Sequence, residues 1–172
     1  MPPISLVFIG TGLAAWLNGL YFLGVGADKK EGGADPLASV GWVSLVAGIA
    51  DLASALYILT LGEGAILLAG IITFYGIFFT LLGVTEIKGL DLRPVGNLSI
   101  AVALVPLMWW EFFAGGWMFR SILLVWAVAF LAIAATTYGK FQAKLLGLIL
   151  LVVAIYTFWV PISILAMGNS IP

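Results

Sequence analysis

The stretch WMFRSILLVWAVAFLAIAATTY, residues 117–138, decides the fold, because it is an apolar run of membrane-spanning length with a single charged residue, Arg120. A hydrocarbon core of about 30 Å is crossed by roughly 20 consecutive apolar residues in a helix. A transmembrane backbone satisfies its own hydrogen bonds as a helix or a closed barrel, and this run lacks the alternating pattern of barrel strands. The stretch is therefore predicted to be a transmembrane helix.

Large side chains form a line along this predicted helix. Phe119, Leu123, Trp126 and Phe130 are spaced i, i+4, i+7 and i+11, which places them on one stripe. Small alanines around the stripe allow neighbouring helices to approach closely. Spacing alone favours packing for such a stripe, although the same arrangement can hold a slot of rings open.

The composition of the whole chain agrees with this helix. Of the 172 residues, 63% are hydrophobic and 9% are charged, and the mean hydropathy is +1.21. These values exclude an ordinary soluble domain. They predict an all-α integral membrane protein with a single transmembrane domain over residues 1–172.

Several kinds of chemistry are disfavoured by residues that the chain lacks. It contains no cysteine and no histidine, so disulfides, thiolate chemistry and imidazole ligands are excluded. A net charge of −1 and the lack of a basic tail argue against a nucleic-acid partner. No catalytic residue, cofactor or metal site is expected, and membrane lipid is an expected partner.

Six apolar runs divide the chain into predicted spans. Two of their links, residues 62–64 and 115–116, are too short for anything but antiparallel neighbours, which predicts three helical hairpins. The predicted spans are residues 4–23, 37–61, 65–85, 95–114, 117–138 and 145–167.

The basic residues predict the orientation of these spans, because basic residues favour cytoplasmic loops. Arg120 alone would lie on the non-cytoplasmic side, and both termini are predicted to lie there as well. The residues predicted on the cytoplasmic side are Lys29, Lys30, Lys88, Arg93, Lys140 and Lys144.

Asp51 is an acid deep within the second apolar run. An ionised carboxylate facing lipid there would cost at least ~2.5 kcal/mol, so Asp51 is expected to face the bundle interior or to stay protonated. It is a candidate pore-lining acceptor, gate or proton-coupling site. The alternative is a neutral carboxyl group hydrogen-bonded to an adjacent helix.

The first predicted span has a face that becomes more polar toward its cytoplasmic end. Phe8, Thr11, Ala15 and Asn18 are spaced i, i+3, i+7 and i+10. The Asn18 amide would either line the exit of a pore or hydrogen-bond between helices. Packing explains most stripes of this kind, but the polar trend favours a pore.

The third predicted span carries Tyr75 and Phe79 on one face, and Gly76 and Gly83 are available for close helix approach. The pair of small residues Ser44 and Gly48 in the second span has the same interpretation. Charged residues near the span ends are interpreted as surface ion pairs: Glu86, Lys88, Asp91 and Arg93 in one cluster, and Glu111 with Arg120 in another.

The stretch YGIFFTLLGVTEIKGLDLRP, residues 75–94, resembles the urea and short-chain amide channel family, AmiS/UreI. Further matches to this family cover nearly the whole chain. They are Asn18-Gly19, Val105-Pro106, Trp126 with a ring four residues later, Gly139-Lys140-Phe141 and Val160-Pro161.

The resemblance implies a six-helix protomer with its own pore, a homohexameric ring, and passive passage of urea or small amides across a bacterial or archaeal inner membrane. It places pore-narrowing residues at Phe8, Tyr75, Phe79, Phe119, Leu123, Trp126 and Phe130. Acid-gated members carry histidines in their outer loops, so gating of that kind is excluded here. Asp51 has no counterpart in the family pattern.

A passive channel for urea or short amides is therefore the predicted function, with no enzymatic activity. Small planar neutral solutes slide between aromatic faces, whereas an ion loses too much hydration in an apolar slot. Expected hydrogen-bonding groups are the Tyr75 hydroxyl, the Trp126 indole N–H, Thr80 and backbone carbonyls, with Thr11 on the pore stripe. The alternative is a proton-coupled small-solute transporter that uses Asp51.

Overall fold

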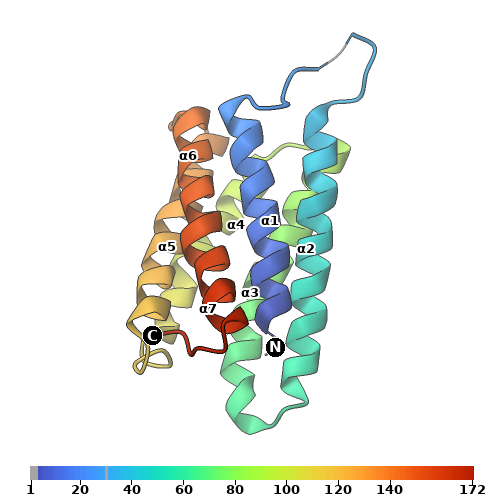
Figure 1. Ribbon diagram of the computed structural model, residues 1–172. Helices are drawn as coiled ribbons and strands as arrows, with labels where there is room; N and C mark the ends of the chain where they lie inside the picture. Colours follow the sequence, from blue (N-terminus) through green and yellow to red (C-terminus); the bar gives the residue numbers. More distant parts are fainter. Residues whose placement is uncertain (1–3, 30) are drawn as a thin grey trace.

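The computed structural model describes residues 4–29 and 31–172, so Lys30 of the first connection lies outside the described residues. Every element of secondary structure in the described residues is a helix, and none is a strand (Figure 1). The elements are α1 (Ile4–Leu23), α2 (Pro36–Leu59), η1 (Glu63–Ala65), α3 (Ile66–Lys88), α4 (Arg93–Leu104), η2 (Val105–Trp110), α5 (Trp117–Thr137), α6 (Ala143–Val153), η3 (Ala154–Trp159) and α7 (Val160–Ala166).

The predicted all-α membrane architecture is confirmed. Five segments of the described chain are long and apolar enough to cross a membrane: Ile4–Leu23, Pro36–Leu59, Glu63–Lys88, Trp117–Thr137 and Ala143–Ala166. Many of their outward-facing side chains are large and apolar, including Leu6, Val46 and Val128. This surface suits lipid contact, and the protein is a multi-pass membrane protein.

The fourth predicted span, residues 95–114, is wrong in its second half. The α-helix ends at Leu104 and continues as the 3-10 segment η2 to Trp110, followed by turns. Pro106 accounts for the change, since it has no N–H to donate to the carbonyl of Val102 and its ring crowds that turn. The fourth helix is therefore shorter than the other five columns.

The last predicted span forms one continuous helical column, made of α6, a π-helical segment and α7. Between α6 and α7 the backbone winds as a π-helix from Ala154 to Trp159, and Pro161 follows at the start of α7. Because Pro161 cannot donate a backbone hydrogen bond, a local change of helical winding beside it is expected. Figure 1 shows α6 and α7 continuing in one direction.

The columns run alternately up and down, and both termini lie at the same end of the bundle (Figure 1). The connections α1–α2, α3–α4 and α5–α6 lie at the opposite end. Three connections at one end and both termini at the other agree with the three predicted antiparallel hairpins.

The backbones of α2 and α3 are in close contact through glycines on both helices. A Cβ atom at Gly48 would lie 2.3 Å from the backbone N of Thr80, and one at Gly83 would lie 2.4 Å from the backbone N of Leu45. A Cβ atom at Gly76 would lie 2.9 Å from the side chain of Leu52. The predicted close approach at Gly76 and Gly83 is confirmed, and only glycine fits these positions.

Glycines also bring the first helix against the last column. A Cβ atom at Gly19 would lie 3.0 Å from the carbonyl oxygen of Gly147, and one at Gly147 would lie 2.8 Å from the carbonyl oxygen of Gly19. Gly12 faces the side chains of Phe158 and Trp159 in the same way, with its added Cβ 2.9 Å from each. The first helix thus packs between α2 and α6.

We predict that Gly48→Ala lowers the free energy of unfolding in detergent by about 1–3 kcal/mol, because the new methyl group meets the α3 backbone and the helices must separate. Gly10→Ala is the matched control, since its Cβ would lie 3.6 Å from Ala47, an ordinary contact. Thermal unfolding monitored by size-exclusion chromatography measures both. Equal stability of the two variants would contradict the close α2–α3 packing.

Candidate functional site

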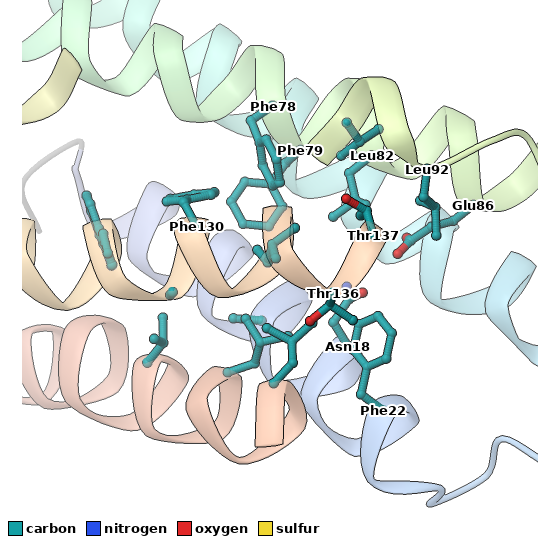
Figure 2. Close-up of a pocket in the computed structure, with 18 of the residues that line it drawn as sticks. Asn18, Phe22, Phe78, Phe79, Leu82, Glu86, Leu92, Phe130, Thr136 and Thr137 are labelled. Atoms are coloured by element: carbon teal, nitrogen blue, oxygen red, sulfur yellow. The ribbon is translucent and has the colours of Figure 1, made fainter. Parts of the chain in front are cut away.

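A cavity of about 370 Å³ lies inside the bundle, between α1, α3, α4, α5 and α6 (Figure 2). Most of its lining is apolar, as expected for a site that holds a small solute loosely. Six of the residues predicted for the pore or its polar groups line this cavity: Thr11, Asn18, Tyr75, Phe79, Trp126 and Phe130.

Aromatic rings close one end of the cavity. Tyr75 lies edge-on to Trp126 with their ring centroids 4.4 Å apart, and it stacks on Phe130 at 5.7 Å. Trp126 in turn stacks on Phe158 of the π segment at 5.4 Å. The stripe of α5 and the Tyr75 face of α3 therefore oppose each other.

The orientation of the Trp126 ring is set by the last column. Its indole Nε1–H donates to Thr157 Oγ1 at 2.8 Å, and the Thr157 hydroxyl donates to the carbonyl oxygen of Val153 at 2.7 Å. The expectation that this N–H serves a solute is wrong for this conformation, because Thr157 occupies it. The Tyr75 hydroxyl has no hydrogen-bond partner among the described residues and is not one of the fully buried oxygens.

A second, smaller cavity of about 30 Å³ lies beyond the ring pair and shares Tyr75 and Trp126 as walls. The remaining predicted pore residues, Phe8, Phe119 and Leu123, line this cavity. Its volume is enough for about one or two water molecules. The predicted stripe of α5 thus spans both cavities, and the Tyr75–Trp126 contact separates them.

The main cavity extends away from the ring pair to the α3–α4 connection, where Asp91 and Arg93 line it. This end of the cavity is called the wide end. Arg93 Nε donates to Asp91 Oδ2 at 2.8 Å, and these hydrogen bonds lower the pKa of the Asp91 carboxyl group. At the other end of the bundle the predicted pairing of Glu111 with Arg120 is confirmed at 3.5 Å. Arg120 also donates from Nε to the carbonyl oxygen of Trp110 at 3.0 Å.

Glu86 does not belong to the surface ion pairs, so that interpretation is wrong for this residue. Its side chain turns inward, is only 3% exposed and lines the cavity. The Ser44 hydroxyl donates to Glu86 Oε2 at 3.1 Å, and Asn18 Nδ2 donates to Ser44 Oγ at 3.0 Å. The amide of Asn18 therefore bonds between helices and lines the cavity at the same time.

The spacing of α3 could have identified Glu86. Tyr75, Phe79, Leu82 and Glu86 are spaced i, i+4, i+7 and i+11, the same pattern that marks the stripe of α5, and all four line the cavity. The neighbouring charges at Lys88 and Asp91 suggested a surface position instead.

Asp51 is fully buried, with 0% exposure, and does not line the cavity. The Thr11 hydroxyl lies 2.9 and 3.1 Å from its two carboxyl oxygens. The prediction that it faces the bundle interior is confirmed, and its partner is on an adjacent helix. Asp51 is linked to the cavity wall by its hydrogen bonds with Thr11.

Thr80 lies at the α2–α3 contact beside Gly48 rather than in the cavity. Its hydroxyl oxygen is buried without a hydrogen-bond partner among the described residues. Within the same part of the chain, no three acidic side chains gather as a metal-binding group. The site thus consists of a pair of aromatic rings in contact and a cavity with polar side chains at its other end.

Comparisons with known proteins agree with this architecture. A family model described as AmiS/UreI family transporter matches residues 1–169. The crystal structure of the urea channel from Helicobacter pylori superposes with a TM-score of 0.81 and 16% identity, over 98% of this chain and 99% of that chain. A cryoEM structure of the Helicobacter pylori urea channel in its closed state gives 0.71 and 18%, over 95% and 97%. A search of curated proteins found no match.

We predict that Ala129→Cys, placed in the cavity wall, reacts with a small water-soluble methanethiosulfonate, because water reaches the cavity from its wide end. The chain has no cysteine of its own, so each variant carries one thiol. Ala47→Cys is the matched control: Ala47 is 2% exposed and Ala129 is 3% exposed, but only Ala129 lines the cavity. Mass spectrometry measures the labelling, and equal rates at the two positions would contradict a water-filled cavity.

Proposed function

Because the chain belongs to the AmiS/UreI family of transporters, we propose that it is a passive channel for urea and short-chain aliphatic amides. Its family is one of transporters and not of enzymes. The observation that supports this solute class most directly is that two cavities lie on either side of the Tyr75–Trp126 ring pair. The solved neighbours in fold are described as urea channels.

The ring pair suits small, planar, neutral solutes. Such molecules pass edge-on between aromatic faces while losing part of their hydration, whereas an ion would lose far more in an apolar constriction. Since Tyr75 and Trp126 are in contact at a centroid distance of 4.4 Å, their rings must separate as a solute passes. Trp126 is held by a hydrogen bond to Thr157, whereas the Tyr75 hydroxyl has no partner among the described residues, so Tyr75 is the ring with fewer polar restraints.

The orientation that we propose places both termini on the non-cytoplasmic side of the inner membrane. Three connections lie together at the end opposite the termini (Figure 1). Lys29 and Lys140 lie in these connections, and Lys88 is the last residue of α3. Basic loops favour the cytoplasm. The wide end of the main cavity then opens toward the cytoplasm.

Assembly and gating follow from the same family membership. We propose a homo-oligomer, a ring of six protomers with a pore in each, with lipid covering the remaining apolar surface. The chain has no histidine, so an acid-sensing gate based on imidazole groups is not available to it.

A proton-coupled transporter remains the second candidate, because Asp51 is buried and contacts Thr11 of the cavity wall. Coupling requires a path for the proton between the two sides. The hydrogen bonds of Asp51 and those of Glu86 form separate groups among the described residues, which favours the passive channel.

We predict that purified protein in liposomes accelerates urea and acetamide entry in stopped-flow light scattering with no pH gradient. Asp51→Asn is expected to keep this flux, since an amide can still accept a hydrogen bond from Thr11. Flux that requires a pH gradient and disappears in Asp51→Asn would favour the coupled transporter instead. Liposomes that gain no permeability would contradict both candidates.

We predict that Trp126→Ala raises acetamide permeation more than urea permeation, because removal of the indole joins the two cavities and relaxes the size limit. Trp42→Ala is the matched control, since Trp42 is 59% exposed on the outer surface of α2. The acetamide-to-urea permeability ratio of each variant is measured by stopped-flow light scattering, and assembly is checked by size-exclusion chromatography. An unchanged ratio in Trp126→Ala would exclude Trp126 from the pathway.

A further inference from the structure

The wide end of the main cavity is polar, unlike the ring-lined end. Asn18 of α1, Glu86 of α3 and Thr136 and Thr137 of α5 surround it, and Figure 2 shows their polar groups at the same end of the cavity. The hydrogen bonds inside the protein determine which of their atoms remain available to a solute.

The amide of Asn18 is held in one orientation. Its Nδ2 donates to the carbonyl oxygen of Ala14 at 3.0 Å and to Ser44 Oγ at 3.0 Å, which uses both of its protons. The opposite orientation would set two acceptor oxygens against each other at Ala14. Asn18 therefore has its carbonyl oxygen, Oδ1, left for the cavity.

Ser44 lies behind the cavity wall and links Asn18 to Glu86 by hydrogen bonds. Ser44 is fully buried and accepts from Asn18 Nδ2. Its hydroxyl lies 3.1 Å from Glu86 Oε2 and 3.4 Å from the carbonyl oxygen of Val40, and it donates its one proton to the nearer of the two, Glu86. Glu86 Oε1 and Asn18 Oδ1 have no hydrogen-bond partner in the described part of the chain. Neither is among the fully buried unpartnered oxygens of the described residues, so each keeps accessible surface, and both residues line the cavity.

The hydroxyl groups nearby add no donors. Thr136 donates to the carbonyl oxygen of Ala132 at 2.8 Å, and Thr137 donates to that of Ala134 at 2.8 Å. At the opening, the guanidinium of Arg93 is bound to Asp91. Beside Asn18 and Glu86 the cavity thus presents acceptor oxygens, while the protons of the nearby amide and hydroxyl groups are used within the protein and the remaining N–H donors of Arg93 lie at the opening.

We propose that Asn18 Oδ1 and Glu86 Oε1 form a binding subsite for the N–H groups of the permeating solute, and that this subsite makes the channel selective for molecules with an NH₂ group. A solute that donates N–H bonds regains here the hydrogen bonds it loses on leaving water, whereas a solute without donors does not. The subsite deepens the proposed function and rests on it, because it recognises the same urea and primary amide class.

Glu86→Gln tests the subsite while keeping the shape of the side chain. The proton of Ser44 directs the glutamine carbonyl oxygen toward Ser44, so the new NH₂ group faces the cavity and an acceptor becomes a donor. We expect urea permeability in liposomes to fall roughly five-fold, the size of one lost hydrogen bond. Water permeability should stay unchanged, because water both donates and accepts.

Two further variants make the result decisive. Glu63→Gln, at an exposed glutamate in η1, should leave both permeabilities unchanged. Ser44→Ala removes the tether without touching the cavity, and it should lower the urea-to-water ratio in the same direction. A wild-type protein that passes no urea overturns the proposed function, and the subsite with it. Wild-type urea flux combined with an unchanged urea-to-water ratio in Glu86→Gln and Ser44→Ala overturns the subsite alone.

Discussion

The contact between the backbones of α2 and α3 is the constraint on which the site depends. Side chains larger than hydrogen at Gly48 and Gly83 would collide with the opposite helix, so these glycines set both the distance and the register of the pair. In that register Ser44 meets Glu86. The helix α2 contributes nothing to the described cavity lining itself, yet its Ser44 and Asp51 each hold a lining residue, Asn18 and Thr11, in place.

Several polar groups inside this apolar bundle bond across a helix interface. Hydrocarbon offers no hydrogen bonds, so a polar side chain without a protein partner is costly. Trp126 bonds to Thr157 across α5 and the last column, and Thr11 bonds to Asp51 across α1 and α2. The Tyr75 hydroxyl, Asn18 Oδ1 and Glu86 Oε1 have no partner among the described residues, and the last two are the groups that we propose a passing molecule uses.

Periodicity predicted the spans and the aromatic stripes well, because burial inside a membrane bundle repeats with the helical turn. It failed where a contact depends on a distant part of the chain. The Trp126–Thr157 bond needs the π turn of the last column, and the rotation of Thr80 toward Gly48 rather than the cavity follows from the α2–α3 contact. The sequence placed the end of the fourth helix too late for a local reason, because Pro106 interrupts the α-helix although the run remains apolar.

The packing of the first helix against the last column has a consequence for biosynthesis. Helices leave the ribosome in chain order, so α1 enters the membrane long before Gly147 exists to meet Gly19. Until α6 arrives, the cavity lacks one wall, and the glycine face of α1 has no partner there. The cavity is therefore closed on this side only after α6 has entered the membrane, because Leu146, Leu150 and Val153 supply part of its lining.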